Sequence, residues 1–386
     1  YTPAVARNLR NGVAKMAPVQ NRIMGETPYD EYTVFFNVIH GPIDFGGGLE
    51  HSSAQYDIMP ALAFADAAGN LGDFMYPLLS HEFFHLWNVK RIRPAEMWPY
   101  DYHAEQYTPL LWWSEGVTDY YADLTNLRAG LWTPDQFLAN AVTNIDQVEQ
   151  APEPWSVEDG SEATWIHEVY VNSSQLYYPK GSLLGCLLDI SIRDATDNAH
   201  NLDEVMRALY TRYYRQNKGF STADLLSELR GAGMPDADTF YRRYIDGRDS
   251  LPYEAVFAKA GLAFHRQIVT SPFVGLSTGT TPTGGIVVQQ VSPNSSAEAA
   301  GVQPGDLLTN IGGVLVTPDH DWGGDYRTRY RGKAGQPLTI TVQRSGRTLT
   351  LNATVQEHST SRVTLERAAH PTPKQAKIWQ GLASGL

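Results

Sequence analysis

The sequence predicts an α+β fold in two parts, an early β-sheet followed by helices and then a small β-rich domain. Apolar residues change from spacings of three and four to short strand-like runs near Leu262. The charge changes at the same place: residues 266–386 hold 11 of the 30 basic but only 7 of the 42 acidic residues, which leaves residues 1–265 with a net charge of −16. The 386 residues, 42% hydrophobic and 19% charged, suffice for two or three domains.

Composition excludes several classes of protein. No segment approaches the ~18 consecutive apolar residues of a membrane span, since the best candidate, Ser182–Ile190, is interrupted by Gly185 and Asp189. The net charge of −12 argues against electrostatic binding to nucleic acid or anionic lipid. The single cysteine, Cys186, excludes an internal disulfide framework and a cysteine-rich zinc finger.

We interpret Tyr1 as a cut end, which favours the bacterial periplasm over the cytoplasm without deciding between them.

In the first part, the β-branched and aromatic run Tyr32–Ile39 predicts a strand. Apolar residues at spacings of three and four predict helices over Tyr76–Lys90 and Leu110–Leu127. The same pattern predicts three later helices: Asn201–Tyr214, Thr222–Gly231 and Asp238–Ile245. Prolines and polar residues between 152 and 162 predict a long loop, which in a compact domain is often functional.

The second part has short apolar runs separated by glycine turns. A helix is expected over Ser296–Ala300, ending at Gly301. The runs predict four strands: Gly285–Val291, Asp306–Ile311, Val314–Val316 and Leu338–Val342.

The segment His81-Glu-Phe-Phe-His85 lies inside the predicted helix Tyr76–Lys90. Residues four apart share one face of a helix, so both imidazoles can point at one ion while Glu82 projects toward an open coordination position. Hydrolysis by zinc needs two such nitrogens, a third protein ligand and a carboxylate near the water. The pattern specifies only three residue positions, so it also occurs by chance.

The next predicted helix offers two carboxylates one turn apart. Glu115 would bind the metal, and Asp119 would hold the free nitrogen of one ligating imidazole. Glu96 and Glu105 are competitors, and spacing alone favours Glu105. The segment Pro99–Pro109 around it has the composition of a loop, however, so Glu115 is preferred.

The fourteen residues HEFFHLWNVKRIRP, beginning at His81, resemble the signature of the glycyl aminopeptidase family of zinc metallopeptidases. This family belongs to the gluzincins and is similar in its catalytic domain to aminopeptidase N and leukotriene A4 hydrolase. The resemblance implies a thermolysin-like domain with one Zn²⁺, and a third ligand in the WSEG segment, which supports Glu115. Three basic residues follow the histidines: Lys90, Arg91 and Arg93. We interpret them as structural, complementing the helix dipole and pairing with acids, with a clamp for a substrate carboxylate as the alternative.

Two further segments resemble substrate-binding parts of related aminopeptidases. The first resembles a glycine-rich strand that aligns the substrate and whose glutamate holds the α-ammonium: Gly47, Gly48, Leu49 and Glu50. A carboxylate fixed near the metal would admit a peptide by its charged end. The segment Tyr178-Pro-Lys-Gly181 is similar to one whose tyrosine donates a hydrogen bond to the oxyanion, which implies Tyr178 as a catalytic residue, with Tyr177 as its neighbouring alternative.

Residues Gly284–Leu308 resemble a PDZ domain of the bacterial protease type. The resemblance implies a loop whose backbone amides receive the C-terminus of a peptide or protein. Four residues are the candidates for this loop: Phe273, Val274, Gly275 and Leu276. A docking or lid role on the catalytic domain is the alternative.

Together these observations predict four segments. Residues 1–130 form a catalytic subdomain with the zinc site, and residues 131–265 a helical subdomain that completes it. Residues 266–357 form the PDZ domain, and residues 358–386 a tail, which is either a packed extension or a loose end.

The predicted function is that of a zinc aminopeptidase acting on peptides with a free N-terminus. The resemblance implies a preference for N-terminal Gly or Ala. Glu82 would take the proton of the attacking water and pass it to the leaving amine. The alternatives are a zinc endopeptidase and a non-catalytic PDZ scaffold whose zinc site is structural.

Overall fold

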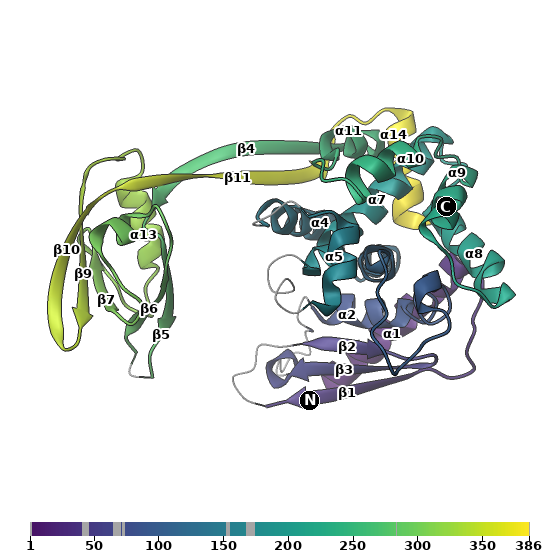
Figure 1. Cartoon of the computed structure of the whole chain (residues 1–386), viewed down its shortest axis with the longest axis horizontal. Helices are drawn as coiled ribbons and strands as arrows, with labels where there is room; N and C mark the ends of the chain where they lie inside the picture. The colour runs from purple at the N-terminus through teal and green to yellow at the C-terminus, as the bar shows by residue number, and fades with distance from the viewer. Residues whose placement is uncertain are drawn as a thin grey trace. The chain divides into compact units, whose positions relative to one another are not determined.

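The structure is a computed structural model and describes residues 2–40, 46–64, 71, 74–151, 155–166, 174–282 and 284–385 (Figure 1). The chain divides into two compact units. Unit 1 consists of Tyr1–His265 with Val363–Leu386, and unit 2 of Arg266–Arg362. The predicted mixture of helix and sheet, with a β-rich region toward the C-terminus, is confirmed.

Unit 1 begins with one long helix and a small sheet. These elements are α1 (Pro3–Met24), β1 (Thr33–Ile39), β2 (Gly47–Glu50) and β3 (Ala54–Pro60). The strand order is β1-β3-β2, with β1 parallel and β2 antiparallel to β3. The strand predicted over Tyr32–Ile39 is confirmed. Buried Met16, Met59 and Leu79 belong to one apolar cluster that joins α1, β3 and α2 (Met75–Phe84), which places α2 beside the sheet (Figure 1).

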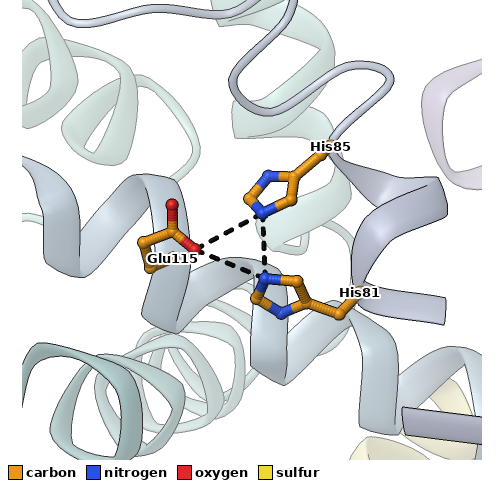
Figure 2. A group of neighbouring side chains, drawn as sticks. All are labelled: His81, His85 and Glu115. Atoms are coloured by element: carbon orange, nitrogen blue, oxygen red, sulfur yellow. Dashed lines mark hydrogen bonds and ion pairs between the residues drawn. The ribbon is translucent and has the colours of Figure 1, made fainter. Parts of the chain in front are cut away.

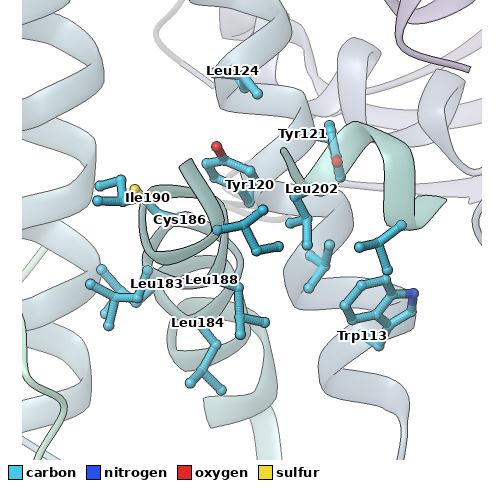
Figure 3. Close-up of a cluster of buried hydrophobic side chains, with 14 of the residues drawn as sticks. Trp113, Tyr120, Tyr121, Leu124, Leu183, Leu184, Cys186, Leu188, Ile190 and Leu202 are labelled. Carbon is cyan, nitrogen blue, oxygen red and sulfur yellow. The ribbon is translucent and has the colours of Figure 1, made fainter. Parts of the chain in front are cut away.

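Most of the remainder of unit 1 is helical, as predicted. Its helices are α3 (Val117–Arg128), α4 (Pro134–Glu149), α5 (Val157–Glu162), α7 (Tyr177–Ala195), α8 (Leu202–Arg212), α9 (Thr222–Gly231), α10 (Ala237–Phe240), α11 (Tyr253–Phe257) and α14 (Pro373–Ser384). Helix α7 is buried along most of its length. Figure 3 shows Leu184 and Leu188 of α7 in one cluster with Tyr120 of α3 and Leu202 of α8.

Several predicted elements differ in extent from the observed ones. Helix α2 ends at Phe84 instead of continuing to Lys90, because the Asn88 side chain donates hydrogen bonds to Trp113 O and Thr118 Oγ1 where the chain turns away. The helix predicted over Leu110–Leu127 consists of a π-helix followed by α3.

The segment predicted as a loop is partly helical. Ser156 caps α5 by accepting a hydrogen bond from the Asp159 amide, so residues 157–162 form a helix. Residues 152–154 of the predicted loop lie outside the described residues.

Two glycines allow the π-helix Trp112–Gly116 and α7 to cross in close contact. A Cβ atom on Gly181 would lie 2.5 Å from Trp112 O, and one on Gly116 would lie 2.5 Å from the Gly181 Cα atom. Both distances are shorter than any ordinary contact between these atoms. The crossing brings the segment that contains Glu115 beside the one that contains Tyr178.

We expect Gly181→Ala to lower the free energy of unfolding by about 2–3 kcal/mol, because the new methyl group collides with backbone atoms that cannot rotate away. Urea denaturation followed by tryptophan fluorescence measures this change. Gly231→Ala is the matched control, since a Cβ atom there meets nothing within 4 Å. It should leave stability unchanged or raise it by up to about 1 kcal/mol. Equal effects of the two substitutions would contradict the steric argument.

The C-terminal residues predicted as a tail include a helix of unit 1. Helix α14 begins at a capping box formed by Thr372 and Gln375. Ile378 and Leu382 are fully buried in the main apolar cluster, and Leu382 O accepts a hydrogen bond from Arg128 Nε. The C-terminus of the described chain is therefore part of the unit 1 core.

Unit 2 is a small antiparallel sheet with two short helices. Its elements are β5 (Leu276–Thr280), β6 (Ile286–Val291), α12 (Ser296–Ala300), β7 (Leu307–Ile311), β8 (Val314–Leu315), α13 (Trp322–Tyr330), β9 (Pro337–Arg344) and β10 (Arg347–Thr354). The order is β10-β9-β7-β6-β5, with β8 paired to β7. The four predicted strands and the predicted helix are present. Strands β4 (Leu262–Phe273) and β11 (Gln356–Arg367) pair with each other and connect the two units along the chain.

Candidate metal centre

Three side chains predicted to bind a metal point at one place (Figure 2). His81 and His85 lie four residues apart at the end of α2, and their Nε2 atoms are 2.8 Å from each other. Glu115, in the π-helix, places its Oε2 atom 3.3 Å from each of these nitrogens. Glu115 is therefore the third member of the cluster, as the sequence predicted.

The hydrogen bonds of the two imidazoles direct their lone pairs to this place. His81 Nδ1 lies 2.7 Å from Asp119 Oδ1, and His85 Nδ1 bonds to the carbonyl oxygen of Asn88. Both acceptors hold the proton on Nδ1, so in the neutral rings each Nε2 atom presents a lone pair. Two lone pairs and a carboxylate oxygen within 3.3 Å repel one another unless a cation lies between them.

The spacing of the donor atoms fits zinc. Ligand atoms held at about 2.0–2.1 Å around a tetrahedral Zn²⁺ lie about 3.3 Å from one another. The two distances from Glu115 Oε2 have this value, and the distance between the nitrogens is somewhat shorter. Two imidazoles and one carboxylate are also a donor set typical of catalytic zinc, which leaves a fourth position open.

The electrostatics of the site also favour a cation. Burial by itself would lower the pKa of His81, but Asp119 and Glu115 raise it well above its ordinary value. The pKa of His85 is raised as well, because Glu115 outweighs the effect of burial. The pKa of Glu115 is lowered although burial opposes this, because both histidines face it. The cluster thus attracts positive charge to its centre.

The rival acids lie elsewhere. Glu105 accepts a hydrogen bond from Tyr107 in an exposed segment, and Glu96 accepts one from Thr108. A π-helix, which inserts one residue per turn, carries Glu115, and such segments are frequent at functional sites. Its presence could not be read from the helical periodicity of the sequence.

Glu82 is buried beside the cluster and faces the glycine-rich strand. A Cβ atom on Gly48 would lie 2.2 Å from the Glu82 carboxylate, so only glycine leaves room for it. Among the described residues, Glu82 Oε2 has no hydrogen-bond partner. Burial raises the pKa of Glu82, and the nearby Glu115 and Glu50 add to this effect, whereas His81 and His85 oppose it. This arrangement suits a group that accepts a proton from a water molecule.

A buried chain of polar groups lies behind Glu82. Tyr32 donates a hydrogen bond to Gln55, whose amide donates to both oxygens of Asp57. Burial raises the pKa of Asp57 to about 7, and the Glu82 carboxylate contributes to this. Asp57 pairs with Gly48 in the register of β3 and β2, so this chain supports the strand against which Glu82 rests. No pattern in the sequence indicates these hydrogen bonds.

The cluster opens into a cavity of about 760 Å³. The cavity reaches from the glycine-rich strand, with Gly47, Gly48 and Glu50, across the metal cluster to Tyr178 on α7. Tyr178 lines the cavity, whereas Tyr177 is buried. Burial and the neighbouring Glu115 raise the pKa of Tyr178 well above its ordinary value, so its hydroxyl stays a hydrogen-bond donor. Leu49 of the same strand is exposed.

Glu50 lies close to the metal cluster, and a lysine neutralises it. Its carboxylate, that of Glu82 and a His85 nitrogen lie within 4.8 Å of one another. Lys90 Nζ is 3.1 Å from Glu50 Oε1.

The other two basic residues of the signature contact backbone carbonyl oxygens. Arg91 donates to the carbonyl oxygens of Leu86 and Pro28, and Arg93 donates to that of Val89. The guanidinium of Arg93 also stacks on the ring of Tyr100.

In unit 2, the predicted carboxylate loop makes a tight turn before β5. Gly275 has a φ of 75°, which favours glycine, and Ala297 N donates to Val274 O. Ser296 Oγ donates to the carbonyl oxygen of Phe273, so the loop is tied to the start of α12. Leu276 begins β5, which lies at one end of the strand order among the described residues. Binding of a C-terminus by these residues stays a prediction.

Comparison with known families identifies the two parts. Residues 75–184 match the M61 glycyl aminopeptidase family. The chain contains an M61 peptidase domain. The matched range includes His81, His85, Glu115 and Tyr178, whereas Glu50 precedes it. Residues 270–355 match the PDZ domain, so a PDZ domain follows the M61 domain.

One solved structure has a similar fold over nearly the whole chain. An aminopeptidase N family protein from Idiomarina loihiensis matches with a TM-score of 0.81 and 24% identity, covering 98% of this chain and 67% of that chain. This likeness concerns the fold. Two further matches are partial. The PDZ domain of HtrA3 bound to a phage-derived ligand has 22% identity and a TM-score of 0.20, and the match covers 24% of this chain and 92% of that chain. The serine endoprotease from Yersinia pestis has 21% identity and a TM-score of 0.19, and the match covers 23% of this chain and 30% of that chain.

The remaining comparisons add two findings. None of the curated proteins compared with the chain matches it. Within the described residues, every helix is too short or too polar to cross a bilayer.

Proposed function

We propose that the chain is a zinc aminopeptidase that removes the first residue, Gly or Ala, from peptides with a free N-terminus. The observation that carries the proposal is the cavity beside the M61 metal cluster. It holds a proton acceptor, Glu82, a carboxylate for the substrate's amine, Glu50, and a hydrogen-bond donor, Tyr178. The preference for Gly or Ala rests on the family resemblance.

His81, His85 and Glu115 would hold the ion, with Asp119 fixing the ring of His81. A zinc ion bound there would act as a Lewis acid toward water and the substrate's carbonyl oxygen. Glu82 accepts a proton from the attacking water and delivers it to the leaving amine. Tyr178 donates a hydrogen bond to the oxygen on which negative charge develops. Glu50 binds the α-ammonium, which fixes the first peptide bond at the reacting position.

The PDZ domain supports a second binding event. We propose that a peptide or protein C-terminus binds at residues 273–276, by addition of a strand beside β5. This binding would recruit substrates or partners without taking part in the chemistry.

Glu50→Ala is expected to lower kcat/KM for alanine p-nitroanilide by about 10–100-fold, because a charge-assisted hydrogen bond to the ammonium is lost. Hydrolysis of a peptide with an acetylated N-terminus should be slow in the wild type and little changed by the substitution. The kcat/KM values for the free and blocked substrates in both proteins test this directly.

Two results would favour the rival functions. Equal cleavage of free and blocked peptides, unaffected by Glu50→Ala, would indicate an endopeptidase. A metal-loaded protein that hydrolyses neither substrate, with a fourth protein ligand closing the coordination sphere, would indicate a PDZ scaffold with a structural zinc.

A further inference from the structure

The carboxylate proposed to bind the substrate's amine already has a cationic partner inside the protein. Lys90 Nζ lies 3.1 Å from Glu50 Oε1, and the two side chains are only 15% and 19% exposed. The backbone amide of Lys90 donates to His85 O at 3.0 Å, and its ammonium group lies 5.3 Å from the centre of the Tyr100 ring. The pair is therefore held in place from two sides, beside a metal-ligand candidate.

Lys90 differs from its two basic neighbours in what it contacts. Arg91 and Arg93 direct their hydrogen bonds at backbone carbonyl oxygens, as groups that hold a turn do. Lys90 instead directs its charge at Glu50, which lines the cavity. The two arginines therefore hold the turn that follows α2, whereas the lysine pairs with an acid, and that acid lines the cavity.

A substrate's α-ammonium bound to Glu50 would lie near a second positive charge. The two oxygens of one carboxylate are about 2.2 Å apart, so cations on each of them are separated by about 5–6 Å. At that distance in a half-buried site, like charges repel strongly enough to change an equilibrium constant by tenfold or more. The lysine therefore weakens the attraction of Glu50 for any other cation.

We propose that Lys90 is the resident counter-cation of Glu50 and sets the strength of the α-ammonium site. It keeps a buried carboxylate compensated when no substrate is bound, and it competes with the incoming ammonium. Lys90 is thus a specificity-determining residue, since it reduces the advantage of a charged N-terminus over a neutral one. This inference rests on the proposed function of Glu50.

Binding of alaninamide to the zinc-loaded protein, measured by calorimetry, tests the inference without relying on turnover. Lys90→Met keeps the length of the side chain and removes its charge. We expect the dissociation constant for alaninamide to fall by about tenfold in this variant. N-acetylalaninamide, which has no charge to repel, should bind both proteins alike. Lys90→Arg, which keeps the charge, should stay closer to the wild type than Lys90→Met does.

Two further variants isolate the interaction. Lys15→Met removes a charge from an exposed position on α1 and should leave alaninamide binding unchanged. In a Glu50→Gln background, Lys90→Met should lose its effect, because the carboxylate for which the two cations compete is gone. Lys90→Gln replaces Lys90→Met if the latter melts at a lower temperature than the wild type.

Unchanged or weaker binding of alaninamide after removal of the charge would overturn the role of Lys90. The proposed function fails separately, if the wild type hydrolyses no aminoacyl anilide. Tighter binding by Lys90→Met in a protein without that activity would support the counter-cation while rejecting the aminopeptidase.

Discussion

Glu82→Gln is expected to lower kcat/KM for aminoacyl anilides by about 10³-fold while zinc stays bound. Glutamine has the same shape but cannot accept the proton of the attacking water. The proposed metal ligands are His81, His85 and Glu115, and Glu82 is not one of them. The substitution should therefore leave zinc affinity within a small factor of the wild type. Elemental analysis of the purified variant and its steady-state kinetics measure the two quantities.

A partly buried carboxyl group outside the cavity provides the matched control. Glu158 on α5 is partly buried, has a pKa raised to about 7 by burial, and accepts a hydrogen bond from Tyr241. Glu158→Gln should keep wild-type activity. If Glu82→Gln retained zinc together with undiminished activity, Glu82 could not be the proton acceptor.

Glu115→Ala has the other large expected effect, the loss of the metal. Changes in groups that merely orient a ligand weaken metal binding by about 10–100-fold, so removal of a ligand should weaken zinc binding by at least about 100-fold. Activity at limiting zinc should fall with it and recover in part at high zinc. Competition with a fluorescent chelator measures the affinity of the variant.

Glu105→Ala is the control for this prediction, because spacing in the sequence favoured Glu105 as the ligand. Its carboxylate lies in an exposed segment, bonded to Tyr107. The substitution should leave zinc affinity unchanged. Equal losses of zinc in the two variants would mean that Glu115 is not the ligand.

Local pattern and the family resemblance together predicted the cluster around the two histidines. The four-residue spacing of His81 and His85 places both rings on the same face, although α2 ends at Phe84 and His85 is its C-terminal cap. The helical pattern around Glu115, together with the resemblance, selected the acid that lies beside both histidines in the structure. The predicted contact of Asp119 with an imidazole is present, at 2.7 Å from His81.

Other contacts between elements, which no motif or resemblance marks, could not be predicted in this way. The approach of Gly116 to Gly181, which places Tyr178 near Glu115, requires knowledge of how two helices cross. The pairing of Lys90 with Glu50 joins residues 40 positions apart. The helical pattern beyond Phe84 was misleading, because Leu86 and Val89 are buried by tertiary packing instead of by a helix face.

Helix α14 was not predicted, although its start has a recognisable sequence pattern. Thr372-Pro-Lys-Gln375 is a capping box with proline at the first helical position, followed by apolar Ile378, Trp379 and Leu382. These residues predict the helix α14 that the structure contains. The interpretation of residues 358–386 as a tail overlooked it.

A titration of Zn²⁺ into chelator-treated protein, with bound metal and hydrolysis of alanine p-nitroanilide followed together, tests the central claim most directly. If His81, His85 and Glu115 form a catalytic zinc site, both signals should rise from near zero and reach their plateaus together at one zinc per chain. Full activity before any zinc is added, or saturation of the metal site without any hydrolysis, would contradict the account.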